Sequence, residues 1–358
     1  MRTVMWKMTK LSMLTTLLLI VVLGGAPPAT IKQAPALIPS VLKVCLGCTY
    51  SSIQTAVDVA RPGDTIEVYP PFLNPWPFSF YNPTLLDKAR NFVALLGQPA
   101  WVENVVISKA LTLEAKPGIA KEVSLVPFSG GTPVFDITAE EGQVTIRGFS
   151  VWSNFSIRWN GKADLILERN RFQQKEPDPY KVNIELNGGS GQAQLADNQI
   201  EGTVVINGAR VNLISNRLKS LLLISGMVKP SERESEVILT QNFIEGSIHI
   251  EAGSRAHLEQ NLLIGGGGSN PVGLDSLDIG LLLETGVQED GQVWLWPIIV
   301  EANQNIIVRY SKGVAIGYNC DDTTTAKVLQ LSGMDNLIEQ NQQNLCPADY
   351  PWPPGFRK

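Results

Sequence analysis

Two stretches of the chain are near-copies of each other, and this repetition restricts the fold more than any other feature. The first copy runs from Asn198 to Asn216 and the second from Asn242 to Asn261. Each begins and ends on Asn, carries Ile-Glu-Gly near its start, and contains two alternating segments joined by a turn of small residues. A repeated unit of about twenty residues is typical of a solenoid, in which neighbouring units bury each other's apolar faces.

The same Asn recurs along the chain, each time before a short apolar segment. Its positions are Asn170, Asn198, Asn216, Asn242, Asn261, the pair Asn303 and Asn305, and a weaker last instance at Asn341. Between successive Asn residues, apolar and polar residues alternate, as in Thr203–Asn207 and Ser247–Glu251. A period of two predicts half-buried strands, and stacked coils of one chain form parallel sheets. We therefore predict an all-β fold, a single-stranded right-handed parallel β-helix.

The recurring Asn has a structural explanation. Asn tolerates a left-handed backbone at a corner, and its amide can hydrogen-bond the equivalent Asn in the coils above and below. We therefore expect a ladder of Asn side chains along the axis. Ligand binding by these residues is the alternative.

The first 29 residues have the pattern of a secretory signal peptide. Arg2, Lys7 and Lys10 precede an apolar stretch from Leu11 to Leu23, and small residues follow. Thirteen residues in that stretch are too few to span a bilayer, which needs about twenty. Without this segment the chain keeps 26 basic against 34 acidic residues. That negative balance argues against binding nucleic acid, and it leaves the signal segment as the only membrane contact.

A short helix is expected over the residues that follow Ser51 and Ser52. Either Ser can cap it, Pro62-Gly63 ends it, and Ile53, Ala56, Val57 and Ala60 share one face. Because an open solenoid end exposes apolar surface, we expect this helix to cover the N-terminal end of the β-helix.

The opening of the β-helix resembles that of the pectin-lyase-like right-handed β-helix proteins, and also that of the periplasmic copper-binding β-helix family. The matching residues are Ser52-Ile-Gln-Thr-Ala-Val57, Pro62-Gly-Asp-Thr-Ile66, Glu103-Asn-Val-Val-Ile107 and Lys109-Ala-Leu-Thr-Leu113. The resemblance implies the fold and leaves the activity open, because such folds host lyases, hydrolases, esterases and proteins without known activity. We divide the chain into a signal peptide (1–29), an N-terminal extension (30–49), the β-helix (50–346) and a Pro-rich tail (347–358).

The chain departs from this pattern by an aromatic insert at residues 70–101. The aromatic side chains around it are Phe72, Trp76, Phe78, Phe80, Tyr81, Phe92 and Trp101. Aromatic rings stack on sugar rings, so Trp76 and Trp101 are candidate ligand-binding residues. The alternative, which we favour, is a small satellite core that holds the insert on the solenoid.

Three longer segments, 226–236, 285–296 and 318–327, follow strands of one type and should leave the solenoid along one edge. They carry the candidate catalytic carboxylates Glu289, Asp290, Asp321 and Asp322 and the candidate ligand-binding residues Trp294 and Trp296. Function in solenoids collects in such loops. Paired acids can hold Ca²⁺ or act on a glycoside, although solvated acidic loops are commoner.

The catalytic motifs of the related enzymes are absent from the sequence. The two His, His249 and His257, occupy outward positions on different strands of one coil. A copper site built from His and Met needs more donors than these two provide, so we expect surface His without a role.

The four Cys suit an oxidising compartment. Three pairings are open, and we favour Cys320–Cys346, which would pin the C-terminal segment, together with the local pair Cys45–Cys48.

These features predict a secreted, periplasmic or cell-surface protein that contacts an extracellular or envelope polysaccharide without catalysis. The first alternative is a carbohydrate-active enzyme, a polysaccharide lyase or glycoside hydrolase that uses the loop carboxylates. The second is a copper-handling accessory protein. We expect a monomer that needs no cofactor, with Ca²⁺ as the one ion that the paired acids suit.

Overall fold

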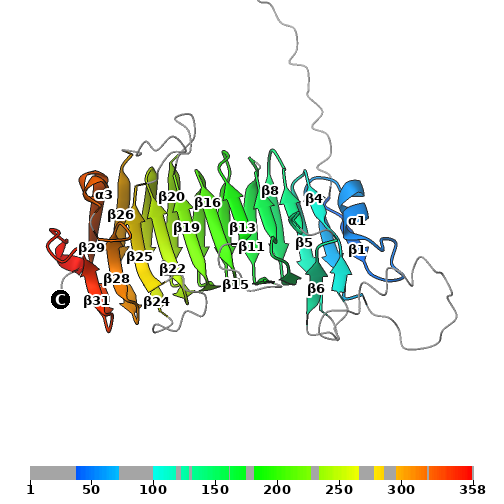
Figure 1. Ribbon diagram of the computed structural model, residues 1–358. Coiled ribbons are helices and arrows are strands. Elements are labelled where there is room, and N and C mark those ends of the chain that lie inside the picture. The colour runs from blue at the N-terminus through cyan, green and yellow to red at the C-terminus, as the bar shows by residue number, and fades with distance from the viewer. Residues whose placement is uncertain are drawn as a thin grey trace, which may run out of the picture. The chain divides into compact units, whose positions relative to one another are not determined.

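The computed structural model describes residues 38–71, 100–117, 122–128, 131–160, 162–174, 181–226, 234–265, 278–285, 296–320 and 322–356. The chain divides into two compact units, Met1–Ile38 and Pro39–Lys358, and all described residues except Ile38 belong to the second. This second unit is a parallel β-helix whose strands form three parallel sheets, A, B and C (Figure 1). The predicted all-β parallel β-helix is therefore confirmed. The expected signal segment lies outside the described residues.

The sheets have 11, 10 and 10 strands. Sheet A contains β1 (Val41–Val44), β2 (Thr65–Val68), β5 (Leu111–Ala115), β8 (Gln143–Arg147), β11 (Asp164–Glu168), β14 (Gln192–Ala196), β17 (Arg210–Ile214), β20 (Ser235–Thr240), β23 (Ser254–Glu259), β26 (Ile298–Asn303) and β29 (Leu329–Met334). Sheet B contains β3 (Ala100–Val102), β6 (Val123–Val126), β9 (Phe149–Trp152), β12 (Arg171–Gln173), β15 (Gln199–Glu201), β18 (Arg217–Lys219), β21 (Phe243–Ile244), β24 (Leu262–Ile264), β27 (Ile306–Val308) and β30 (Leu337–Glu339). Sheet C contains β4 (Val105–Ile107), β7 (Phe135–Ile137), β10 (Ile157–Trp159), β13 (Val182–Asn187), β16 (Thr203–Asn207), β19 (Leu221–Ser225), β22 (Ser247–Glu251), β25 (Ile279–Glu284), β28 (Lys312–Ile316) and β31 (Gln343–Cys346).

The helical elements of the described residues are α1 (Ile53–Val59), α3 (Thr323–Val328) and the short 3-10 helix η2 (Pro354–Phe356). Among these residues, no helix has the length and apolar character that crossing a membrane requires.

One coil carries the chain through sheets A, B and C before it returns to sheet A one strand further along. Strands β14, β15 and β16 make one such coil, and β17 begins the next. Register is kept between coils, so equivalent residues stack on each other, as Leu195 does with Leu213. The spacing between stacked residues is that of neighbouring strands, about 4.8 Å.

Rows of aliphatic side chains fill the interior of the solenoid. In sheet A, successive strands stack Leu167, Leu195, Leu213, Leu239 and Leu258, and none of these is more than 2% exposed. Burying one Leu side chain contributes about 1.5–3 kcal/mol. Because each Leu is covered by those of the coils on either side, this stabilisation depends on stacking.

A row of buried Asn follows the corner between sheets A and B. Its buried members are Asn170, Asn198, Asn216, Asn242, Asn261 and Asn305, and the partly exposed Asn336 ends it. Asn198 is typical: its backbone N–H and its Nδ2 donate to Asn216 Oδ1 at 2.9 and 3.0 Å, and its Nδ2 also donates to the Leu167 carbonyl at 2.8 Å. The predicted ladder is therefore confirmed, and its amides form hydrogen bonds between neighbouring coils.

Two expectations about this corner were wrong. The left-handed residue is the one before the Asn: positive φ angles of 53–57° belong to Arg169, Asp197, Ser215, Gln241, Gln260, Gln304 and Asp335. The last rung is Asn336, which follows the left-handed Asp335, whereas Asn341 Oδ1 accepts from the Tyr310 N–H at a different corner. The left-handed conformation is therefore taken by the residue before the Asn, and the Asn side chain makes the hydrogen bonds of the ladder.

Helix α1 closes the N-terminal end of the solenoid, as predicted (Figure 1). Ser52 is its N-cap and accepts from the Thr55 N–H at 3.3 Å, and Ile53, Ala56 and Val57 are buried. The Glu103 carboxylate accepts from the Ile53 and Gln54 N–H groups at 3.1 and 3.0 Å. Glu103 therefore fixes the helix to the first complete coil, because it satisfies donors that a helix start leaves unpaired.

The solenoid extends beyond the expected boundaries at both ends. Strand β1 pairs with β2 although it lies in the expected N-terminal extension. Strand β3, at the end of the aromatic insert, pairs with β6 in sheet B, while residues 72–99 lie outside the described residues. In the Pro-rich tail, Trp352 and Phe356 join the hydrophobic core. The tail thus covers the last coil with two aromatic rings.

The two disulfides are Cys45–Cys48 and Cys320–Cys346, the predicted pairs, with Cα atoms 5.0 and 5.2 Å apart. These separations are ordinary for disulfides. The second bond joins the segment after β28 to the end of β31, so it ties the last coil to the one before it.

Candidate functional site

The three segments 226–236, 285–296 and 318–327 begin where β19, β25 and β28 end. These strands all belong to sheet C, in the order β28-β25-β22-β19, and each segment leads to the next strand of sheet A. The expectation that the segments share one edge is therefore confirmed. We call this the C–A edge: the carboxyl ends of the sheet C strands together with the starts of the sheet A strands that follow them.

A row of partly exposed amides marks the C–A edge. Asn187 Nδ2 donates to Asn160 Oδ1, and Asn207 Nδ2 donates to Asn187 Oδ1, both at 2.9 Å. Unlike the buried corner Asn, these three side chains reach solvent. The same row continues through later coils with Ser225, Glu251 and Glu284. It therefore presents one polar group per coil.

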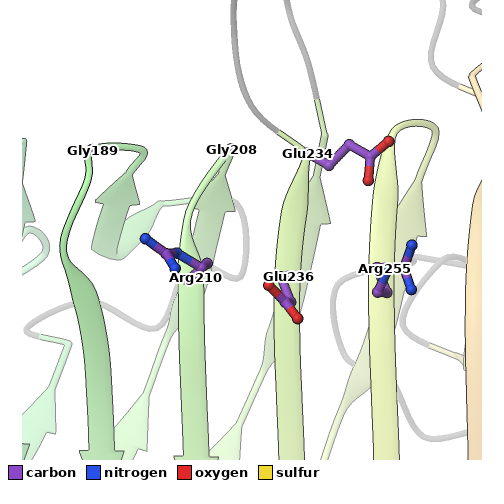
Figure 2. Close-up of a pocket in the computed structure, with 6 residues that line it drawn as sticks. All are labelled: Gly189, Gly208, Arg210, Glu234, Glu236 and Arg255. Carbon is purple, nitrogen blue, oxygen red and sulfur yellow. The ribbon is translucent and has the colours of Figure 1, made fainter. Parts of the chain in front are cut away.

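Beside this row, a shallow surface pocket of about 390 Å³ lies where the sheet A strands begin (Figure 2). Its lining residues are Gly189, Gly208, Arg210, Glu234, Glu236 and Arg255. Arg210, Glu236 and Arg255 are register partners on β17, β20 and β23. Among the described residues no ion pair joins any two of these three, and Arg210 Nη2 donates to the Ser190 carbonyl at 2.8 Å. The two guanidinium groups and the carboxylate between them can therefore bind a polar ligand.

Of the four predicted ligand-binding Trp residues, Trp296 is at the C–A edge. It lies two residues before β26 and is 36% exposed. The next residue, Pro297, accepts from the Gly253 N–H at 3.1 Å, which holds this position against the turn that leads to Arg255. Trp76 and Trp294 lie outside the described residues.

Trp101 requires a correction. Its ring is 1% exposed and its indole N–H donates to the Tyr69 carbonyl at 2.9 Å. A buried ring offers no face to a ligand, so Trp101 belongs to the core, and its indole N–H has the partner that a buried Trp usually finds.

Asp322, a candidate catalytic carboxylate, is the N-cap of α3. Its Oδ1 accepts from the Thr324 and Thr325 N–H groups, both at 2.9 Å, and its Oδ2 accepts from the Thr325 and Thr285 hydroxyls. Because both of its oxygens accept hydrogen bonds, the Asp322 carboxylate stabilises the start of α3. The other three candidates, Glu289, Asp290 and Asp321, lie outside the described residues.

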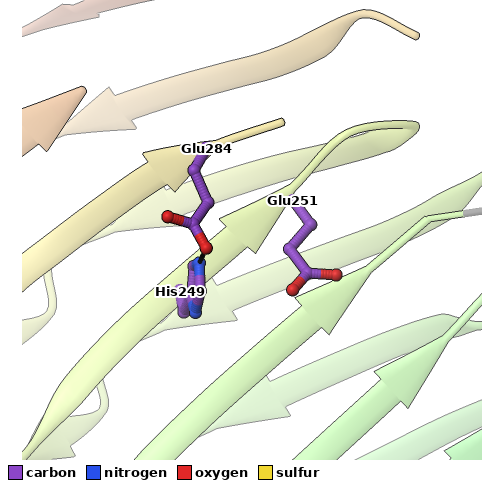
Figure 3. Close-up of side chains that lie close together, drawn as sticks. All are labelled: His249, Glu251 and Glu284. Atoms are coloured by element: carbon purple, nitrogen blue, oxygen red, sulfur yellow. Dashed lines mark ion pairs between the residues drawn. The ribbon is translucent and has the colours of Figure 1, made fainter. Parts of the chain in front are cut away.

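A cluster of one imidazole and two carboxylates lies further along the C–A edge (Figure 3). His249 and Glu251 are two residues apart on β22, and Glu284 of β25 is the register partner of Glu251. One ligand atom from each lies within 4.8 Å of the other two. His249 Nε2 is 2.9 Å from Glu284 Oε1, although the contact lacks the alignment of a hydrogen bond.

His249 faces outward on sheet C, as expected, but it is less exposed than a free surface side chain. Its side chain is only 15% exposed, because Leu223 and Leu282 flank it in register on the outer face of sheet C. The imidazole is thus held against two apolar neighbours and beside two carboxylates.

His257 has a different arrangement on sheet A. Its Nε2 is 3.7 Å from Glu259 Oε2, and its Nδ1 is 3.3 Å from Glu301 Oε2. The two carboxylates therefore approach opposite nitrogens of the ring. A hydrogen bond from Asn303, followed by the electrostatic influence of His257, holds the pKa of the Glu301 carboxyl below its usual value.

Of the pocket residues, Glu234 and Glu236 belong to the expected loop segment 226–236, whereas Arg210 and Arg255 were not among the expected site residues. Arg210 and Arg255 occupy equivalent positions in the two near-copies, directly after the small-residue turn. Glu236 lies at the end of that segment, six residues before Asn242, just as Arg210 and Arg255 lie six residues before Asn216 and Asn261. The register of β20 agrees with this spacing and places Glu236 between the two Arg.

No family model matches the chain, and no curated protein or solved structure does. The function therefore has to be argued from the C–A edge itself.

Proposed function

We propose that this protein is a secreted polysaccharide-binding protein that acts without catalysis and binds its ligand along the C–A edge. The observation that carries the proposal is the regular succession of polar groups there. Amides, a hydroxyl and carboxylates follow one another in one row, and Arg210, Glu236 and Arg255 follow one another beside it. A polysaccharide is itself a repeating chain of hydroxyl groups and can therefore engage several coils at once.

The chemistry of the pocket suits such a ligand. Guanidinium groups donate and carboxylates accept, so the set Arg210, Glu236 and Arg255 can bind hydroxyls of either orientation, and the two Arg can also bind a uronate carboxylate. Trp296 supplies an exposed ring at the same edge. Aromatic side chains with one exposed face are well suited to pack on the apolar face of a sugar ring.

Secretion is part of the proposal. Two disulfides support it, because such bonds persist mainly outside the reducing cytosol. The signal-like pattern of residues 1–29 supports it as well.

Membership of the pectin-lyase-like superfamily is likewise a proposal, supported by the parallel β-helix and by the opening motifs. Catalysis is not proposed. The described candidate acid, Asp322, has both carboxylate oxygens engaged at the start of α3, and a helix cap of this kind lacks the free oxygen that attack or proton transfer needs.

The proposal is tested with the full chain on a panel of neutral and uronate-containing polysaccharides, by affinity electrophoresis and by assays for released sugar. Retention on at least one polymer without product is expected. Trp296→Ala and the double variant Arg210→Ala/Arg255→Ala should each weaken retention on the order of tenfold, about 1.4 kcal/mol.

Arg217→Ala is the matched control. Arg217 is exposed on sheet B and pairs with Glu245 at 3.1 Å, away from the C–A edge, so its loss should leave retention unchanged. Absence of retention on every polymer, or equal weakening by Arg217→Ala, would refute the proposed site. Release of sugar from any polymer would refute the non-catalytic assignment.

A further inference from the structure

We propose that His249, Glu251 and Glu284 form a binding site for a divalent transition-metal ion of the Zn²⁺ class. The site goes beyond polysaccharide binding, since it needs neither the pocket nor Trp296. Its basis is the convergence of three donor atoms from two coils on the outer face of sheet C (Figure 3).

The geometry follows from the strand pairing. Residues two apart on a strand point to the same face, so His249 and Glu251 both project outward from β22. Glu284 adds the second carboxylate because β25 stacks on β22 in register with Glu251. The three ligand atoms lie within 4.8 Å of one another, and the shortest separation is 2.9 Å.

These separations suit one shared ion. Zn²⁺ bonds to His nitrogen and carboxylate oxygen at about 2.0–2.2 Å, which places ligand atoms about 3.4 Å apart in a tetrahedral site. With the three ligand atoms already within 4.8 Å of one another, binding would require the two Glu side chains to adjust to that spacing. Three protein ligands leave the fourth position to water or to another small ligand.

The surroundings of His249 favour an ion over a simple ion pair. Its Nε2 is buried and has no aligned hydrogen bond, although Glu284 lies 2.9 Å away. Leu223 and Leu282 are the register partners of His249 on the two neighbouring strands, so apolar residues flank the ring on both sides. One imidazolium can neutralise only one of the two carboxylates, whereas a divalent cation neutralises both.

The three donor atoms, one nitrogen and two oxygens, indicate which class of metal ion the site would bind. An imidazole ligand disfavours Ca²⁺ and Mg²⁺, which prefer all-oxygen sites. Both Cys320 and Cys346 are in a disulfide and offer no thiolate. One nitrogen and two oxygens suit Zn²⁺, and by the general order of affinities Cu²⁺ binds the same set more tightly.

The molecule contains its own control. His257 is also followed two residues later by a Glu and faced by a Glu from the next coil, Glu259 and Glu301. There the two carboxylates approach opposite ring nitrogens, so no single ion can take one nitrogen and both carboxylates.

The test is isothermal titration of the untagged, metal-free full chain with ZnCl₂, without polysaccharide. One Zn²⁺ per chain is expected. His249→Gln and Glu284→Gln should each lower the affinity at least tenfold, while His257→Gln should leave it unchanged. Thermal unfolding of each variant in the absence of metal verifies that the fold persists.

Several results would overturn the site. They are no Zn²⁺ binding by the wild-type chain, equal losses in the His249→Gln and His257→Gln variants, and competition by Ca²⁺ as effective as by Zn²⁺. Tighter binding of Cu²⁺ that His249→Gln also abolishes would support it. Because no sugar is present, failure of the metal site and failure of polysaccharide binding are separate results.

Discussion

At the scale of single residues, two consecutive residues have different roles at the corner between sheets A and B: the first turns the backbone, and the second forms hydrogen bonds between coils. Ser215 bends the backbone with a φ of 54°, and Asn216 then places its amide between coils. A non-glycine residue in this conformation costs about 1–2 kcal/mol. The hydrogen bonds of the buried Asn offset that cost, and this explains why the Asn recurs while the residue before it varies.

Replacing Asn216 by Ala should lower the free energy of unfolding by about 2–4 kcal/mol. The change leaves the buried Asn198 N–H and the Leu195 carbonyl without these partners, and each unsatisfied buried group costs about 1–3 kcal/mol. Urea denaturation followed by circular dichroism measures the loss. Asn207→Ala, in the partly exposed row, is the control and should change stability by about 0.5 kcal/mol or less. Equal losses in the two variants would contradict the structural role of the buried ladder.

At the scale of elements, the short helices are held by carboxylates. Glu103 accepts from the first N–H groups of α1, and Asp322 does so for α3. Burial raises the pKa of the Asp322 carboxyl, but the hydrogen bonds from Thr325, Thr324 and Thr285 together outweigh it, so the net pKa lies below the ordinary value.

The stability that Asp322 contributes should therefore be lost in acid. Because its pKa is lower in the folded than in the unfolded chain, its contribution is complete above the unfolded value of about 3.9 and disappears as the pH falls through the folded value. Asp322→Asn should flatten the fall in melting temperature between about pH 5 and pH 2, and Asp322→Ala should cost about 1 kcal/mol at neutral pH. Asp349→Asn, at an exposed position, is the control, and an unchanged acid profile in Asp322→Asn would contradict the assignment.

At the scale of the β-helix unit, the stacked coils need covered ends. Helix α1 closes one end and the Trp352 and Phe356 side chains close the other. Covered ends hinder coil-on-coil stacking between molecules, and the monomer stays a prediction.

The C-terminal closure should depend on the Cys320–Cys346 bond, which spans 26 residues. The double variant Cys320→Ala/Cys346→Ala should lose about 3 kcal/mol of unfolding free energy, whereas Cys45→Ala/Cys48→Ala, which opens a three-residue link, should lose less. Denaturant unfolding measures both, and limited proteolysis should cut the first variant within its last coil. Equal losses would show that the long link does not hold the C-terminal coil.

The sequence by itself determined the class of fold, the Asn ladder, the N-terminal helix and the disulfide pairs. Each of these follows from periodicity or from local chemistry: alternation at period two, a recurring Asn, Ser52 before an apolar helical face, and few Cys to pair. The tertiary structure alone decided which outward side chains are neighbours. Glu251 is the register partner of Glu284 only because the chain returns to the same register after an inserted segment. The stacking of the apolar core sets that register, and no local pattern in the chain encodes it.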